Sequence, residues 1–215
     1  MKKKLSLLLM VAFMTLLSAQ SFAWGSSKTD ASNYPKKPMT FITPGGAGGG
    51  WDTTIRTVAK VLKDTKLVKV AMPITNRPGG GGGVALSYLQ GQAGNEKMLT
   101  VYSPPLLLIN LNGSSKYGYK NVTPVARLIT DYAAFVVKKG SKYTSIKQVM
   151  DALKKDPKSI KIGGQSAAGS MDHIQFLMIA KAAGVKDIKK IDYISFQGGE
   201  GPAQLLGGHI DLYST

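Results

Sequence analysis

Short apolar runs, glycine-rich segments and amphipathic stretches follow one another along the chain. The apolar run 39–42 leads directly into the glycine-rich segment 44–52. Apolar side chains then recur at the spacing of one helix face, at Ile55, Val58, Ala59 and Leu62. The order predicts a strand, a loop and a helix. The candidate N-caps of this helix are Asp52, Thr53 and Thr54.

The same order of strand, glycine loop and helix occurs three more times. The glycine loops of these units are 79–83, 163–170 and 197–202. Further strands are expected over 68–74, 98–103, 122–128 and 133–137, the last of them buried because it is nearly continuously apolar. A helix over 145–154 is expected to begin at Ser145, with Gln148 completing a capping box. Alternating strands and helices predict an α/β fold with a mostly parallel sheet.

Each glycine loop is a candidate anion site because it leads into the first turn of a helix. Glycine permits tight turns and gives a ligand close access to backbone amides. The first amides of a helix lack internal partners, and the helix dipole makes that end weakly positive. These properties favour a bound anion. For a single loop such as 44–52, a flexible segment that binds nothing is the alternative.

The N-terminus has the pattern of a secretory signal peptide over residues 1–23. Three lysines, Lys2 to Lys4, precede the apolar run 5–17, and Ser21-Phe22-Ala23 fits a small-x-small cleavage site. We therefore expect cleavage near Ala23, a disordered polar segment over 24–33 and a periplasmic mature protein. A retained membrane anchor is the alternative. The chain has no cysteine, which excludes disulfides, thiolate metal sites and a lipid-modified cysteine.

The strongly basic charge does not form the pattern of a nucleic-acid-binding protein. The formal net charge is +16, and removal of the signal peptide's three lysines leaves about +13. The lysines are scattered, and no basic patch interleaved with stacking aromatics is present. We expect a solvated basic surface and no nucleic-acid partner. The positive field would still attract a small anion.

Signatures of common enzymes are missing from the glycine loops. No G-x-G-x-x-G and no P-loop motif occurs, so the chain lacks the fingerprints of nucleotide cofactors. Residues 164–169 resemble a nucleophile elbow around Ser166, but the second glycine is one position late for G-x-S-x-G. The chain has two histidines, His173 and His209, too few without cysteine for a zinc site. We expect no enzyme activity, no cofactor and no metal; a secreted serine hydrolase using Ser166 is the alternative.

Several of these features together resemble one family, the periplasmic solute-binding proteins of tripartite tricarboxylate transporters, also called Bug-type receptors. The resemblance runs from Tyr34 to Asp211. It rests on Tyr34-Pro35, the loop 44–52, Asn76-Arg77-Pro78-Gly79, the loop 164–170 with His173, and the segment 193–198 followed by Leu205, Leu206, Gly208 and Asp211. The chain departs from the family at 195–198, where the family commonly has Tyr-Lys-Gly, and at the bulky Trp51.

The resemblance implies a two-domain α/β Venus flytrap of the periplasmic-binding-protein type. We expect domain 1 over 34–103, and domain 2 with the start of the crossover over 104–215. In the family the C-terminal third of the chain returns to complete the first domain. This sequence ends at that crossing, so the resemblance implies a chain truncated at its C-terminus and an incomplete first domain. A non-functional fragment of the receptor is therefore a further alternative.

The resemblance also implies a function and a site. The function is an extracytoplasmic receptor that binds a small di- or tricarboxylate and delivers it to the integral membrane permease subunits of the transporter. Backbone amides of two facing loops would hold the ligand. The ligand-binding residues that we expect are Gly45, Gly46, Ala47, Gly48 and Asp52 in the first loop, Ser166, Ala167, Gly169 and Ser170 in the second, and Gly198.

Overall fold

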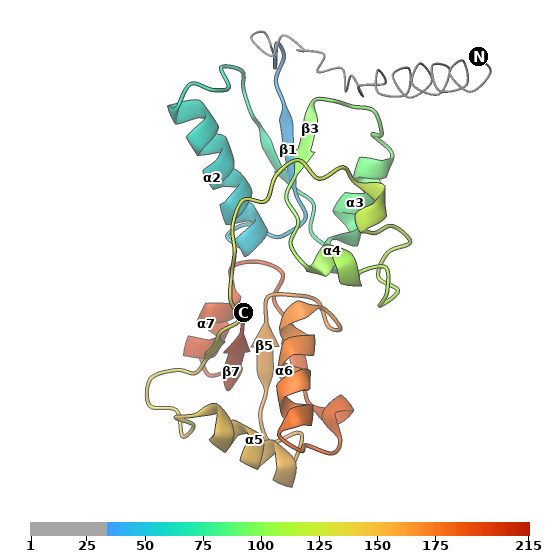
Figure 1. The fold of residues 1–215 in the computed structure, drawn as a ribbon. Coiled ribbons are helices and arrows are strands. Elements are labelled where there is room, and N and C mark those ends of the chain that lie inside the picture. Colours follow the sequence, from blue (N-terminus) through green and yellow to red (C-terminus); the bar gives the residue numbers. More distant parts are fainter. Residues whose placement is uncertain (1–33) are drawn as a thin grey trace, which may run out of the picture. The chain divides into compact units, whose positions relative to one another are not determined.

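The computed structural model describes residues 34–215, so the expected signal peptide and the segment 24–33 lie outside the described residues. All the elements below belong to residues 37–215, which form one compact unit. They build two β-sheets with helices packed against them (Figure 1). The chain forms the first sheet before residue 101 and the second after residue 134.

The first sheet has three parallel strands with β1 in the centre. β1 (Thr40–Thr43) pairs with β2 (Ile74–Asn76) on one side and with β3 (Met98–Thr100) on the other. Helix α2 (Gly50–Asp64) packs on β1 and β2, and α3 (Gly83–Gln90) follows a 3₁₀ turn, η2 (Gly80–Gly82). One cluster of buried apolar side chains in this half consists of Met39, Phe41, Ile55, Ala59 and Val101.

The second sheet has four strands in the order β4-β7-β5-β6. β5 (Ile162–Gly164) is parallel to both β6 (Tyr193–Ser195) and β7 (Leu212–Ser214), and β4 (Phe135–Val136) is antiparallel to β7. Three helices belong to this half: α5 (Ile146–Lys155), α6 (Met171–Ala182) and α7 (Gly201–Leu206).

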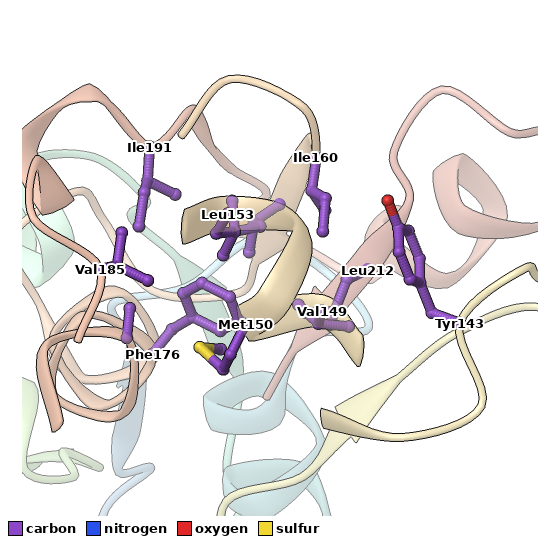
Figure 2. Packing of buried hydrophobic residues seen from close by; sticks show 11 residues of the cluster. Tyr143, Val149, Met150, Leu153, Ile160, Phe176, Val185, Ile191 and Leu212 are labelled. Atoms are coloured by element: carbon purple, nitrogen blue, oxygen red, sulfur yellow. The ribbon is translucent and has the colours of Figure 1, made fainter. Parts of the chain in front are cut away.

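The larger hydrophobic core lies under the second sheet (Figure 2). Leu153 of α5 and Phe176 of α6 meet Ile162 of β5 there, and all three side chains are fully buried. Phe135 of β4 packs edge-on against Phe176 with ring centroids 5.7 Å apart. Because α5 and α6 bury their apolar faces in this core, the start of α6 has a fixed position beside the loop that follows β5.

Short elements connect these parts. Helix α4 (Pro105–Leu108) follows β3, and the 3₁₀ turns η3 (Tyr119–Asn121) and η4 (Ile188–Lys190) complete the set.

The structure confirms the strand–loop–helix units, the mostly parallel pairing and the helix after Ser145. Ser145 accepts a hydrogen bond from the Gln148 amide, whereas the Gln148 side chain accepts from Thr144 rather than from Ser145.

Four local predictions were wrong. Residues 68–73 and 122–128 are not in strands, and Val125 and Leu128 are 80% and 50% exposed. Apolar residues favour a strand only where a neighbouring strand can pair with them. The predicted strand 133–137 shortens to β4, an edge strand whose Val136 is 43% exposed rather than buried. Helix α2 begins at Gly50, with Gly49 as its N-cap, which places Asp52 inside the first turn.

No helix among residues 34–215 has both the length and the apolar composition needed to cross a membrane.

Candidate functional site

A cleft of about 700 Å³ lies where the loops after β1, β3, β5 and β6 meet. That volume is in the range of small-molecule sites, roughly 300–1,000 Å³. Its walls include the first turns of α2 and α6 and the extended segment 126–133. Other lining residues from the glycine loops and strand ends include Gly45, Gly81, Tyr102, Ser103, Gln165, Ser166, Ala167, Ser170 and Gln197.

Asp52 holds the first loop in shape. Its carboxylate accepts hydrogen bonds from the Gly48 amide at 3.0 Å, from Asn76 Nδ2 at 2.9 Å and from Arg56 Nε at 2.9 Å. Asn76 Nδ2 also donates to the Gly45 carbonyl at 3.0 Å. The Arg56 guanidinium lowers the pKa of the buried Asp52 carboxyl below its ordinary value. A carboxylate with three donors of its own organises the loop, and it does not line the cleft.

The first loop also contacts the loop after β6. The Gly46 amide donates to the Gln197 carbonyl at 2.8 Å, and the Gly199 amide donates to the Ala47 carbonyl at 3.2 Å. A Cβ atom on Gly46 would lie 3.1 Å from the Gly198 Cα, so the two backbones approach more closely than a side chain allows. This contact sets the position of the Gly45 and Gln197 parts of the wall.

In the second loop, Ser166 and Asp172 exchange two hydrogen bonds. The Ser166 amide donates to Asp172 Oδ2 at 2.7 Å, and the Asp172 amide donates to Ser166 Oγ at 2.9 Å. Tyr193 Oη donates to the Ser166 carbonyl at 2.8 Å. The Gly169 amide donates to His173 Nδ1 at 3.0 Å. The Ser170 amide also donates to the Ala167 carbonyl at 2.9 Å, so three of the amides that we expected to hold a ligand have partners in the loop or in the first turn of α6.

Ser170 differs from these residues because its hydroxyl is unpaired. It is the N-cap of α6 and is completely buried, but its side chain makes no capping bond. Within residues 34–215, Ser170 Oγ has no hydrogen-bond partner. Buried hydroxyls are nearly always hydrogen-bonded. An unpaired hydroxyl in the wall of a cleft is therefore a natural donor to a bound ligand.

Two helix N-termini reach the cleft. Gly50 and Trp51 begin the 15-residue α2, and Met171 begins the 12-residue α6; all three residues line the cleft. The first intrahelical bond of α2 is donated by Thr53, so the amides before it have no partner within the helix. Each N-terminus carries roughly half a positive charge. Together they favour an anionic group between them.

Ser166 has the carboxyl group of Asp172 beside it but no histidine base. His173 Nδ1 accepts the Gly169 amide, and its ring stacks on Tyr193 with centroids 4.3 Å apart. Burial lowers the pKa of His173, which favours the neutral imidazole. Over the described range 34–215, no hydrogen bond joins Ser166 to His173 or to His209. The described residues therefore do not form a Ser–His pair around Ser166.

The described residues also contain no cluster of three or more His, Cys, Asp or Glu side chains that could hold a metal ion.

The expected site residues fall into two groups. Gly45, Ser166, Ala167 and Ser170 line the cleft. The others shape the loops behind it: Gly46, Ala47, Gly48, Asp52, Gly169 and Gly198. Direct ligand contact by any of these residues stays a prediction.

Sequence reasoning missed several lining residues. Gln165 directly follows β5 and Gln197 lies two residues after β6, and a glutamine close to the end of both strands could have identified them. Gly81 lies in the second glycine loop, which was recognised but not assigned to the site. Tyr102 follows β3 at the same edge of the sheet. The sequence did not indicate Arg127 as a site residue, because we predicted that its segment forms a strand. That strand does not form.

The fold and the cleft define an α/β protein of the periplasmic-binding-protein class. Its structure is similar to those of TctC- and Bug-type solute-binding proteins, which confirms the resemblance predicted from the sequence. A scan against protein-family models and a search of curated proteins found no match.

Three similar solved structures show the extent of the likeness. A TctC solute-binding protein from Polaromonas is 26% identical, with a TM-score of 0.54 over 85% of this chain and 60% of its own. BugD is 21% identical, with a TM-score of 0.59 over 83% of this chain and 58% of its own. MatC from Rhodopseudomonas palustris, solved with bound malate, is 20% identical, with a TM-score of 0.67 over 83% and 60%. The chain thus spans about 60% of the length of these proteins.

Proposed function

We propose that this protein is an extracytoplasmic solute receptor that binds a small organic carboxylate in the cleft between the starts of α2 and α6. The observation that carries the proposal is the buried, unpaired Ser170 hydroxyl at one of two helix N-termini that line the same cleft. Helix starts and a free hydroxyl supply donors to an anion. The malate bound to MatC, which has a similar fold, supports the same class of ligand.

The location and the partners of the receptor follow from the same proposal. The similar structures are periplasmic binding proteins, and the first 23 residues have the pattern of a signal peptide. We infer that the mature protein is periplasmic and delivers its ligand to the integral membrane permease subunits of a tripartite transporter. Di- and tricarboxylates are the ligands that the family resemblance suggests.

Thermal unfolding of the full chain with candidate ligands tests the proposal. Malate, citrate and benzoate would be added separately, with glucose as a neutral control. A ligand at 100 times its Kd stabilises the folded state by about 2.7 kcal/mol, which raises Tm by several degrees. A rise with at least one acid and none with glucose supports the function. No rise with any acid would contradict it.

A further inference from the structure

The wall of the cleft contains two aromatic rings in contact, one of them at the start of α2. Trp51 and Tyr102 both line the cleft, with ring centroids 5.6 Å apart and planes tilted by 59°. Trp51 comes from the first turn of α2 and Tyr102 from the end of β3. We call this pair the aromatic wall.

The polar atoms of the aromatic wall already have partners in the protein. Trp51 Nε1 donates to Ser103 Oγ at 2.8 Å, and Tyr102 Oη donates to the Gly82 carbonyl at 2.8 Å. Burial raises the pKa of Tyr102, so the phenol stays protonated and keeps this bond. The wall therefore offers a ligand π-surface and no donor.

Glycines behind the rings keep the wall in place. A Cβ atom on Gly82 would lie 2.9 Å from Tyr102 Cε1 and 3.4 Å from Trp51 Cη2. A Cβ atom on Gly45 would lie 3.4 Å from Trp51 Cε3. Each ring thus packs directly on backbone atoms. A residue larger than glycine at these positions would occupy the space that the ring fills.

The charges of the cleft fit one anionic group better than several. Among the described lining residues, Arg127 is the one cationic side chain, and it shares the cleft with the carboxyl groups of Asp131 and Asp172. The two helix starts contribute roughly half a positive charge each. Arg127 and the two helix starts together about balance Asp131 and Asp172, so the cleft has no excess of positive charge for a ligand with several carboxylates. A tricarboxylate would place two further negative charges near Asp131 and Asp172.

We propose, resting on the carboxylate-receptor function above, that the preferred ligand class is an aromatic monocarboxylate. Its carboxylate lies at the starts of α2 and α6, within reach of Ser170 Oγ, and its ring packs on Trp51. Aromatic pairs gain about 0.5–1.5 kcal/mol beyond the burial of area, a factor of roughly two to thirteen in affinity. The wall therefore discriminates a flat ring from a saturated one of the same size.

Calorimetric titration of the full chain with benzoate and cyclohexanecarboxylate tests this preference, because the two acids share a carbon skeleton and a charge. We expect benzoate to bind about three- to tenfold more tightly than the saturated acid, and more tightly than citrate. Benzyl alcohol, which has the ring without the carboxylate, should not bind measurably. In Trp51→Leu the ratio between the two acids should fall towards one.

Fluorescence gives a second measurement that does not depend on folding of the Trp51 variant. The chain has two tryptophans, Trp24 and Trp51, so in Trp24→Phe the emission reports on Trp51 alone. Benzoate should change this emission with the same apparent Kd as calorimetry. Trp24→Phe should bind benzoate as the unmodified chain does.

The outcomes separate this inference from the proposed function. Equal affinities for benzoate and cyclohexanecarboxylate, or tighter binding of malate or citrate with no change in Trp51 emission, would overturn the aromatic ligand and leave the carboxylate receptor standing. Absence of binding by every acid would overturn both. An unchanged benzoate preference in a folded Trp51→Leu variant would show that the ring does not pack on Trp51.

Discussion

Asp172 and Ser166 hold each other through two reciprocal hydrogen bonds. The Ser166 amide donates to the Asp172 carboxyl at 2.7 Å, and the Asp172 amide donates to the Ser166 hydroxyl at 2.9 Å. In α2 the carboxyl of Asp52 accepts the Gly48 amide at 3.0 Å in a related way. Each helix therefore uses an aspartate in its first turn to hold the glycine loop before it.

The two aspartates should affect stability in opposite directions as the pH changes. Burial raises the pKa of Asp172 above its ordinary 3.8. The folded state then holds a proton in the range just above pH 3.8, where the unfolded chain has lost it. Stability contributed by the neutral carboxyl is therefore lost as the pH rises through this window. Urea unfolding between pH 3.5 and 7 measures the free energy of unfolding as a function of pH. Its slope against pH should be flatter or more positive for Asp172→Asn than for the unmodified chain. An identical slope would contradict this prediction.

Asp52 gives the complementary prediction. The Arg56 guanidinium lowers its pKa below 3.8, so the folded state releases this proton at a lower pH than the unfolded chain. The stabilisation is complete above pH 3.8 and is lost as the pH falls through the lowered pKa. Asp52→Asn should cost about 1–3 kcal/mol at pH 7, because hydrogen bonds to a buried carboxylate are weakened. The difference in free energy of unfolding between Asp52→Asn and the unmodified chain should become smaller in acid. Urea unfolding over the same pH range measures this difference.

The parts that could be predicted from the sequence are those determined within one segment. Helix α5 follows from its own apolar spacing and from Ser145, and α3 follows from the apolar residues after the polyglycine loop. Asp52 shows the limit of local reasoning. It looked like an N-cap, but its partner Asn76 lies 24 residues away, and that contact exists only after β1 and β2 pair.

The same limit applies to the candidate site. Glycine loops at strand ends indicated where the cleft would lie, because the carboxyl ends of parallel strands share one edge. Which amides remain available depends on side chains six or four residues later, as with Asp172 for Ser166 and His173 for Gly169. The contact between Trp51 and Tyr102 joins residues from α2 and from the end of β3, so neither segment alone reveals it.

The aromatic wall should depend on the absence of a side chain at Gly82. Gly82 has φ +101, and an added Cβ would lie 2.9 Å from Tyr102 Cε1. Gly94 is a matched control, since its φ is +82 but nothing lies within 4 Å of the added Cβ. Both alanine variants have an unfavourable φ, whereas only Gly82→Ala also overpacks, at about 1–3 kcal/mol. Chemical unfolding should show Gly82→Ala less stable than Gly94→Ala by about that amount, and benzoate binding should weaken only in Gly82→Ala.

Two serines at helix N-caps separate stability from binding. Ser145 Oγ accepts the Gln148 amide at 3.3 Å, whereas Ser170 Oγ has no partner within the described residues. Replacing a bonded cap by alanine costs about 1 kcal/mol. Ser145→Ala should therefore lower stability by that amount and leave ligand affinity unchanged.

Ser170→Ala should weaken ligand binding without lowering stability. The variant loses no capping bond and removes an unpaired buried hydroxyl, so its free energy of unfolding should stay equal or rise by up to about 1 kcal/mol. Its affinity for a carboxylate should fall about fivefold, the effect of one hydrogen bond near 1 kcal/mol. Urea unfolding and calorimetric titration of both variants measure the two effects on the same samples. If Ser170→Ala binds as tightly as the unmodified chain, Ser170 is not a ligand donor and the carboxylate must lie elsewhere in the cleft.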